Sequence, residues 1–282
     1  MARPALMDFL AEIIELKRER LRSRLRDERA TRELRARAHD ARRSASPHRL
    51  RAALDERGRV NIISEIKRAS PSKGTIRARV DPVWMARKYE AGGAAAISVL
   101  TEEDRFRGSL DDLRAVRGAV SLPLLRKDFI FDEFQLYEAA AAGADALLLI
   151  VAVLDDERLS RLIRVAEDEL RMDALVEVHN GEEMLRAEAS GATLVGVNNR
   201  DLRSFEVSLD VSVELAQLAP PGLSLVSESG LRSGEDLRRL RALGYKGFLI
   251  GETLMRAPEP DAALRSLIEE AEGGDEGRRA KG

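Results

Sequence analysis

From about residue 60 onward, two patterns of hydrophobic residues alternate along the chain. Short apolar runs rich in β-branched residues are typical of buried strands. The longer segments between them carry apolar residues at every third or fourth position, as amphipathic helices do. Eight strands are predicted in this part, at residues 60–65, 95–100, 123–127, 146–151, 174–178, 194–198, 223–228 and 247–250.

A predicted helix follows each strand, at residues 81–91, 109–117, 132–142, 155–170, 181–189, 208–219, 234–243 and 259–271. Eight successive strand–helix units are the pattern of an α/β fold, the (β/α)8 or TIM barrel. A doubly wound open sheet is the competing fold, but it normally carries a glycine-rich dinucleotide turn after its first strand. No GxGxxG sequence follows Glu65, so we expect the barrel.

Four glycines support this repeat. Gly93, Gly143, Gly191 and Gly244 each close a predicted helix just before the second, fourth, sixth and eighth strand. Their intervals of 50, 48 and 53 residues each correspond to one pair of strand–helix units. Glycine suits the left-handed position that follows the end of a helix.

Residues 1–58 are expected to form a helical extension that packs on the barrel. Helical spacing of apolar residues predicts one helix over residues 5–43, and a short helix is expected over residues 49–57. The catalytic barrel is assigned to residues 59–272, and a glycine-rich, charged and disordered tail to residues 273–282. The apolar stripe at residues 6–14 either covers the mouth of the barrel or docks on its flank.

Composition limits the setting and the chemistry. The 282 residues include no cysteine, which excludes disulfides, thiolate metal sites and a cysteine nucleophile. No apolar stretch approaches the ~20 residues that cross a bilayer, and no secretory signal is recognisable at the amino terminus. We therefore expect a cytoplasmic protein.

The formal net charge of −2 hides a basic segment. Residues 17–51 hold 14 Lys and Arg against 5 Asp and Glu, a local charge of +9 that leaves −11 for the remainder. Such a segment could contact nucleic acid. It contains no Phe, Tyr or Trp to stack on a base, so a solvated, arginine-rich helical face is favoured.

The ends of the predicted strands carry most of the chemically useful side chains. Six of the eight strands end on ionisable or amide side chains, namely Glu65 with Lys67, Lys127, Glu177, Asn198, Glu228 and Glu252. Glu65 and Lys67 lie two residues apart and therefore point to the same face of a strand. Because the carboxyl ends of barrel strands form the active-site rim, we expect a catalytic site there.

Two of these strand ends have the features of a phosphate-binding cup. Ser229 and Gly230 follow the seventh strand, and Gly251 and Glu252 follow the eighth, just before a short predicted helix. Small residues and free backbone N–H groups at these positions bind phosphate in many barrels. We expect a phosphorylated small-molecule substrate, bound by the backbone N–H of Glu252 while its side chain turns away.

The lysines and glutamates that remain over the mouth suit acid–base chemistry. A protonated lysine can donate to a developing oxyanion, and a shielded glutamate can act as base or acid. A Schiff base on Lys67 or Lys127 is an alternative. No cluster has metal-ligand spacing, so no metal is expected. His179 follows the fifth strand and could reach the rim, but a satisfied surface histidine is the favoured interpretation.

Eight motifs run in order from residue 60 to residue 256: SEIKRASPSKG, AISVLTEEDRFRGS, LLRKDFIFDEFQLYEA, ADALLLIVAVL, LVEVHN, GVNNRDL, VSESGL and FLIGETLM. Together with the helical extension, they closely resemble the indole-3-glycerol-phosphate synthase family of tryptophan biosynthesis. The resemblance implies a carboxy-lyase without cofactor or metal. Its substrate would be 1-(2-carboxyphenylamino)-1-deoxyribulose 5-phosphate, converted into indole-3-glycerol phosphate, carbon dioxide and water.

The resemblance also implies catalytic roles. Lys127 would be the general acid that protonates the substrate ketone during ring closure. Lys67 would pair with the substrate carboxylate and assist dehydration. Glu177 and Glu65 would remove and return protons, and Asn198 would orient a hydroxyl or carboxylate of the substrate.

The remaining residues implied by the resemblance bind the substrate. Arg200 would support Asn198 and the neighbouring carboxylates, and Glu228 is placed among the binding residues. Phe106 and Phe129 would contact the aromatic ring. The phosphate-binding positions would be Ser70, Ser229, Gly230, Gly251 and Glu252.

Two rival functions remain open on the sequence. Phosphoribosylanthranilate isomerase shares the phosphate cup but uses a cysteine base, which this chain lacks. A barrel that only binds a phosphorylated metabolite would not need both acid and base. As partners we expect the phosphorylated substrate, no nucleic acid and no membrane, with the chain a monomer or weak homodimer.

Overall fold

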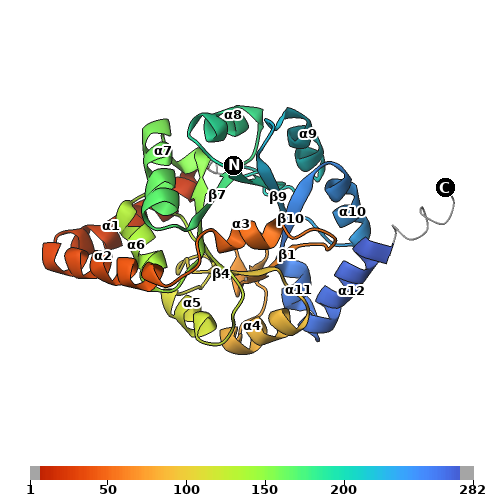
Figure 1. The fold of residues 1–282 in the computed structure, drawn as a ribbon, viewed down its shortest axis with the longest axis horizontal. Helices are drawn as coiled ribbons and strands as arrows, with labels where there is room; N and C mark the ends of the chain where they lie inside the picture. Colours follow the sequence, from red (N-terminus) through yellow and green to blue (C-terminus); the bar gives the residue numbers. More distant parts are fainter. Residues whose placement is uncertain (1–6, 274–282) are drawn as a thin grey trace, which may run out of the picture.

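Eight parallel strands close into a barrel in the computed structural model, which describes residues 7–273 (Figure 1). Each strand pairs with its successor along the chain, and the last pairs with the first. The predicted (β/α)8 barrel is confirmed, with every strand boundary within two residues of its predicted place. The strands are β1 (Ile62–Ile66), β4 (Ala96–Leu100), β5 (Leu124–Lys127), β6 (Ala146–Ile150), β7 (Asp173–Val178), β8 (Leu194–Asn198), β9 (Ser224–Glu228) and β10 (Tyr245–Ile250).

Helices surround the barrel, and most of them begin at a polar cap. The side chains of Asp81, Ser109, Asp132, Asp155, Asn180 and Ser233 each accept a hydrogen bond from the first turn of the helix that follows. The helices are α4 (Pro82–Ala91), α5 (Leu110–Arg117), α6 (Glu133–Ala141), α7 (Asp156–Arg164), α8 (Gly181–Ala189), α9 (Asp210–Leu218), α10 (Gly234–Ala242), the short α11 (Glu252–Arg256) and α12 (Pro260–Gly273).

Short irregular helices complete this set. A 3₁₀ turn, η1 (Val151–Val153), follows β6, and α7 continues into a π-helical turn, η2 (Val165–Glu169). The helix predicted over residues 155–170 is therefore not uniformly α-helical. The glycine prediction is confirmed, because Gly93, Gly143, Gly191 and Gly244 have positive φ angles of 91°, 87°, 90° and 98°.

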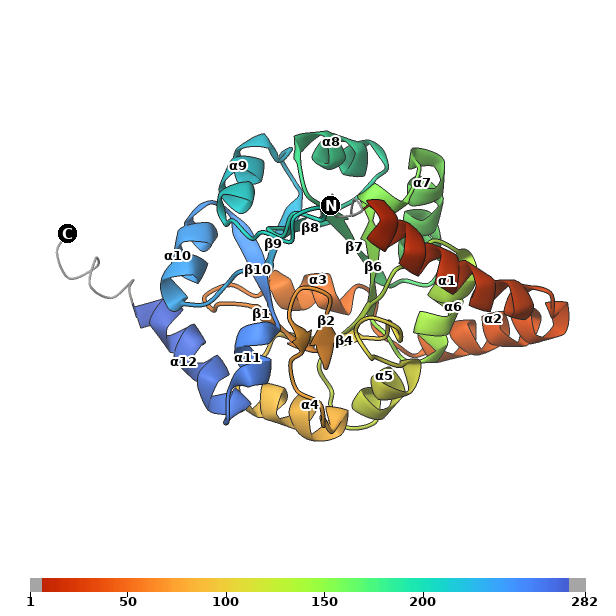
Figure 2. The ribbon, with the colours of Figure 1, turned by 180° about the vertical axis from the view of Figure 1, so that it is seen from behind.

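The extension forms two long helices, so the prediction of one helix over residues 5–43 is wrong. α1 (Met7–Leu25) and α2 (Glu28–Arg43) are joined by a turn at which Asp27 caps α2 by accepting from the backbone N–H of Ala30. The capped turn lets α2 pack against α6. Both views show α1 and α2 projecting from the flank of the barrel (Figures 1 and 2).

Several arginines of the basic segment form ion pairs with acidic residues of the barrel. Arg24 pairs with Glu138, Arg35 with Glu169 and Arg42 with Asp145, so these arginines bind acidic groups of the barrel rather than water alone. The expected solvated face is therefore correct only for part of the segment. The local excess of positive charge attaches the extension to a negatively charged barrel.

The helix α3 (Arg49–Leu54) lies across the amino-terminal opening of the barrel (Figure 1). Leu50 and Leu54 are buried among the inward-facing strand residues. Gly247 makes room for Leu54, because a Cβ atom at residue 247 would lie 2.8 Å from a methyl group of that leucine. With this end filled, the opposite end is left for a site.

The domain limits predicted from the sequence stay predictions. The limit between residues 58 and 59 falls in the loop between α3 and β1, and Gly273 is the last residue of α12. The rest of the expected tail, residues 274–282, and the start of the apolar stripe at Leu6 lie outside the described residues. Between residues 7 and 273, no helix is long and apolar enough to cross a membrane.

Candidate active site

The alternation of side chains along the strands places the predicted residues in the barrel mouth. Leu50 and Leu54 mark the inward face of the barrel, which they share with Ile63, Leu125, Leu175, Val226 and Leu249. Because successive strand residues point to opposite faces, the residue two positions later also points inward. That residue is Glu65, Lys127, Glu177, Glu228 and Gly251, respectively.

These residues line a cavity of about 730 Å³ at the carboxyl-terminal rim. All fourteen residues predicted for the site belong to its wall: Glu65, Lys67, Ser70, Phe106, Lys127, Phe129, Glu177, Asn198, Arg200, Glu228, Ser229, Gly230, Gly251 and Glu252. They come from every strand end except that of β6, which contributes Leu148 and Ile150. The structure thus brings the predicted set together in one place.

A lysine between two glutamates lies at the centre of the charged wall. The Nζ atom of Lys127 lies 2.9 Å from Oε2 of Glu177 and also binds Oε2 of Glu228. Lys67 forms a second ion pair with Oε1 of Glu65. The glutamates are almost fully buried. Charges this deeply buried are retained only when they are paired or used.

Two glycines leave space for the carboxylates. A Cβ atom at Gly251 would collide with the carboxylate of Glu65, and one at Gly196 would collide with that of Glu228. Gly251 was predicted as a phosphate contact, and this second reason for a glycine was not foreseen. Gly196, in the motif GVNN, was missed because its importance depends on a neighbouring strand.

The two glutamates beside Lys127 differ in protonation. Burial opposes ionisation of Glu177, but Lys127 and His179 outweigh it and hold the pKa of Glu177 below its usual range. Burial raises the pKa of Glu228 to about 7, against the opposing effect of Lys127. Burial alone would lower the pKa of Lys127, and the two carboxylates raise it above its ordinary value. At neutral pH the cluster therefore holds a protonated lysine, an ionised Glu177 and a readily exchanged proton on Glu228.

Asn198 connects this cluster to the loop after β9. Its Nδ2 donates to Oε1 of Glu177 at 3.1 Å, and its Oδ1 accepts from the hydroxyl of Ser229 at 2.9 Å. The backbone N–H of Arg200 also donates to Oδ1 of Asn198, at 3.1 Å. The guanidinium of Arg200 instead donates to the carbonyl of Phe205, so its support of Asn198 runs through the backbone.

One end of the cavity has the features of an anion site. Ser229 and Gly230 have positive φ angles of 67° and 84°. Gly251 is the N-cap residue of the helix α11 and has no side chain that could accept a hydrogen bond from the first N–H groups of that helix. The carboxylate of Glu252 accepts from Nε of Arg256 at 3.1 Å, which holds it along the helix. Ser70 reaches the cavity from the hairpin of β2 (Ala69–Ser70) and β3 (Gly74–Thr75).

The cavity wall also includes three cations that the motif reasoning missed, Lys73, Arg232 and Arg256. Each lies in a loop or short helix that follows a barrel strand, where no periodic pattern marks it. These cations follow Ser70, Gly230 and Gly251 closely in the sequence, and this proximity to predicted phosphate-binding positions could have indicated them.

The other end of the cavity is apolar. The rings of Phe106 and Phe129 lie 6.3 Å apart at an angle of 45°. Leu100, Leu148 and Ile150 extend this surface, and Leu10 of α1 also contributes to the wall. Figure 2 shows α1 on the same face of the barrel as α11. Of the two alternatives for the apolar stripe, Leu10 therefore lies at the mouth of the barrel.

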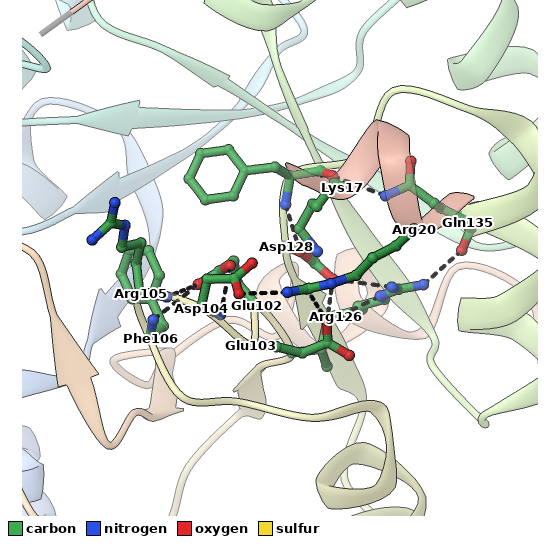
Figure 3. Close-up of polar contacts among 12 residues, drawn as sticks. Lys17, Arg20, Glu102, Glu103, Asp104, Arg105, Phe106, Arg126, Asp128 and Gln135 are labelled. Carbon is green, nitrogen blue, oxygen red and sulfur yellow. Dashed lines mark hydrogen bonds and ion pairs between the residues drawn. The ribbon is translucent and has the colours of Figure 1, made fainter. Parts of the chain in front are cut away.

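Polar contacts fix α1 to the loops around Lys127 (Figure 3). Lys17 lies 2.6 Å from Oδ1 of Asp128, whose other oxygen binds Arg126 at 3.0 Å and Thr101 at 2.6 Å. Arg20 binds acidic residues 103 and 104 in the loop after β4. The extension is thus bound to the residue that directly follows Lys127, a contact that no local pattern indicates.

The expectation for His179 is wrong. Its side chain is only 10 % exposed and lies beside Glu177, with Nε2 3.3 Å from Oε1. The backbone explains the position, because His179 directly follows β7 and precedes the cap of α8. Among residues 7–273, no group of three or more His, Asp or Glu side chains could hold a metal ion.

A closed barrel of parallel strands with an acid–base cluster at its carboxyl-terminal rim defines the chain as a (β/α)8-barrel enzyme. Similar solved structures include 3-hexulose-6-phosphate synthase from Salmonella typhimurium, with a TM-score of 0.60 and 16% identity over 74% of this chain and 96% of that chain. KGPDC from Streptococcus mutans has a TM-score of 0.59 and 14% identity, over 80% of this chain and all of the other. At such identities the likeness shows the fold alone.

Sequence comparison gives the family. The family model described as indole-3-glycerol phosphate synthase matches residues 10–267. The indole-3-glycerol phosphate synthase of Carboxydothermus hydrogenoformans is 49% identical, over 92% of this chain and 99% of the relative. That of Syntrophobacter fumaroxidans is 44% identical, over 93% and 97%. The chain belongs to the indole-3-glycerol phosphate synthase family, as its motifs predicted.

Proposed function

We propose that the cavity converts 1-(2-carboxyphenylamino)-1-deoxyribulose 5-phosphate into indole-3-glycerol phosphate, carbon dioxide and water by general acid–base catalysis. Family membership supports the reaction. The position of the Lys127 ammonium between the carboxylates of Glu177 and Glu228 carries the assignment of roles. This group is held protonated in a cavity with an aromatic end and an anion-binding end.

The substrate fits between these two ends. In the order of the barrel, β5 and β6 lie across from β9 and β10. The phenyl ring therefore lies against Phe106 and Phe129, the phosphate at the loops after β9 and β10, and the ketone between them, near Lys127. The charges also match a substrate with a phosphate and a carboxylate, because six cations of the wall (Lys67, Lys73, Lys127, Arg200, Arg232, Arg256) face five acids, of which Glu228 exchanges its proton near neutral pH.

The reaction uses the cluster in sequence. Lys127 donates a proton to the ketone oxygen while the ring carbon that bears the carboxylate attacks the ketone carbon. Loss of carbon dioxide returns an electron pair to the ring and restores the benzene system. The new hydroxyl leaves as water with a proton from Lys67, and Glu177 removes a proton from the adjacent CH₂ group. The proton on Glu177 passes to Lys127, 2.9 Å away, and Glu65, the ion-pair partner of Lys67, relays a proton from water to Lys67, so that both lysines are again protonated.

The same geometry disfavours the Schiff-base alternative for Lys127. A lysine must lose its proton before it can attack a carbonyl. Glu177 and Glu228 raise the pKa of Lys127, so the amine stays charged. The charged amino group of Lys127 can donate a proton, but it has no free electron pair with which to attack a carbonyl carbon.

Turnover of the proposed substrate, followed by indole fluorescence, tests the proposal. Lys127→Ala should lower kcat at least ~10²-fold with a much smaller change in KM, because it removes a proton donor. Lys88→Ala is the matched control, since Lys88 pairs with Glu259 and Asp261 on the outside of the barrel. A wild-type enzyme without turnover contradicts the reaction, and an unimpaired Lys127→Ala variant contradicts the role of Lys127.

Three broader expectations join this proposal. Residues 1–58 act as an extension of a barrel formed by residues 59–272, the chain is a monomer or weak homodimer, and it works in the cytoplasm. Limited proteolysis, sedimentation velocity and cell fractionation measure these properties directly.

A further inference from the structure

His179 is a histidine with a side chain only 10 % exposed, and the reaction does not use it. It does not belong to the wall of the cavity and lies behind Glu177, on the side away from Lys127. Glu183 of α8 holds it in place with a single oxygen, which accepts from the backbone N–H of His179 at 2.8 Å and lies 3.0 Å from Nδ1 of the ring. The N-cap residue Asn180 in turn accepts from the backbone N–H of Glu183 at 3.0 Å.

Both ring nitrogens of His179 face carboxylates. Nδ1 lies 3.0 Å from Oε2 of Glu183. Nε2 is buried 3.3 Å from Oε1 of Glu177, within ion-pair distance but with no hydrogen-bond partner among residues 7–273. An ionised carboxylate can only accept hydrogen bonds, so a ring nitrogen without a proton would place its lone pair next to a negatively charged oxygen. The arrangement therefore favours the doubly protonated imidazolium. Burial alone would lower the pKa of His179, but the two glutamates raise it to about 10.

The His179 imidazolium gives Glu177 a second cationic neighbour besides Lys127. Oε2 of Glu177 faces Lys127, while its Oε1 faces His179 and accepts from Asn198. Glu228 binds Lys127 through one oxygen, and its other oxygen has no hydrogen-bond partner among residues 7–273. Two carboxylates share Lys127, and within the described part of the chain only Glu177 has a second cation beside it.

We propose that His179, held by Glu183, is a positioning residue that keeps Glu177 ionised and oriented as the base of the reaction. The proposal rests on the proposed function, since it assigns a support to one of its catalytic groups. The groups that face the ring are Glu177 of β7 and Glu183 of α8, and beyond Glu177 lie Lys127 of β5 and Asn198 of β8. His179 acts through Glu177 and does not touch the substrate.

The pH dependence of His179→Gln tests this role. Without the cation, the pKa of Glu177 rises, so the acid limb of the profile of kcat against pH moves upward by about one pH unit. On the acid limb, below the usual pKa of a glutamate, kcat falls up to about tenfold, and the loss shrinks toward neutral pH. KM changes less than about twofold because His179 lies outside the cavity wall. His39→Gln is the matched control, since His39 pairs with Glu169 at the surface and leaves the profile unchanged.

A loss of kcat that is equal at every pH, with an unmoved acid limb, shows a structural role only and overturns the proposal. A second test uses the wild-type protein and therefore does not depend on whether the His179→Gln variant folds. In ¹⁵N-histidine NMR, one of the three histidines should keep the imidazolium pattern above pH 8, and a neutral His179 at pH 7 also overturns the proposal. Failure of the proposed function is distinguishable, because it appears as absent turnover in the wild type.

Discussion

The two ends of the barrel both bury charged residues, and they pair them differently. At the amino-terminal end, Asp145 accepts from Arg49 at 2.9 Å, Arg117 at 3.0 Å and the backbone N–H of Leu124 at 3.1 Å, with Arg42 at 3.4 Å. At the carboxyl-terminal end, one oxygen of Glu228 has no partner among the described residues, and Lys127 is shared by two glutamates.

This difference in pairing indicates that the buried charges of one end stabilise the fold, while those of the other end are available for chemistry. A buried carboxylate whose partners are complete and that faces no cavity has only a structural effect when it is lost. A buried carboxylate with too few partners, facing a cavity, can bind or exchange protons with a substrate. The fully paired end attaches the extension to the barrel, and the incompletely paired end holds the proposed reaction.

The largest expected effect on stability comes from Asp145→Asn. The substitution leaves three arginines without their common anion, so the free energy of unfolding should fall by about 3 to 5 kcal/mol, as for other broken buried pairs. Urea denaturation measures this loss. The kcat of the folded fraction should stay unchanged, and Asp55→Asn, an exposed partner of Lys246, should cost less than about 0.5 kcal/mol. Loss of activity without loss of stability in Asp145→Asn contradicts the division between the two ends.

Glu228→Gln should change stability in the opposite direction. The pKa of Glu228 in the folded protein is raised to about 7, mainly by burial, from an unperturbed 4.5. The folded state therefore prefers the protonated form, and ionisation removes stability progressively between about pH 4.5 and pH 7. A neutral glutamine avoids this loss, so the variant should gain up to about 3 kcal/mol at pH 8 and almost nothing at pH 4.5, while turnover falls.

Unfolding in urea at the two pH values checks this prediction. An equal change in stability at pH 8 and pH 4.5 speaks against a titrating Glu228. A destabilised variant at pH 8 contradicts the claim that the carboxylate is incompletely paired.

The smallest effect is expected for Lys17→Met, at the contact between α1 and the loop after β5. Asp128 loses one charged partner but keeps Arg126 and Thr101, so the unfolding free energy should fall by about 1.5 kcal/mol. Arg22→Met is the control, because Arg22 is exposed and pairs only with Glu15 in the described structure. Equal stabilities of the two variants, measured by thermal denaturation, contradict a stabilising role of Lys17 at this contact.

Local patterns in the sequence predicted the barrel and its rim well. Strand alternation places Glu65, Lys127 and Glu177 inward, and this requires only the position of each strand. Glycine caps mark the helix ends. All fourteen expected residues lie in the cavity wall, because the topology of the barrel brings every strand end to one rim. Ser70, Phe106 and Phe129 among them were implied by the family resemblance and not by the strand pattern.

Two of the misses share one physical cause, which is pairing between residues far apart in the chain. The position of His179 beside Glu177 and the contact of Lys17 with Asp128 depend on side-chain packing that no local period encodes. The turn at Asp27 was missed for a different reason. Asp27 is an ordinary helix cap, but helix-favouring residues on both sides concealed it.

The seating of α3 in the barrel has a consequence for protein synthesis. A ribosome makes Leu50 and Leu54 before any strand, yet Leu54 packs beside Gly247 in the last strand. During translation, Leu54 therefore cannot pack against Gly247 until almost two hundred further residues have been synthesised. A nascent chain that stops before β10 leaves Leu54 without that neighbour.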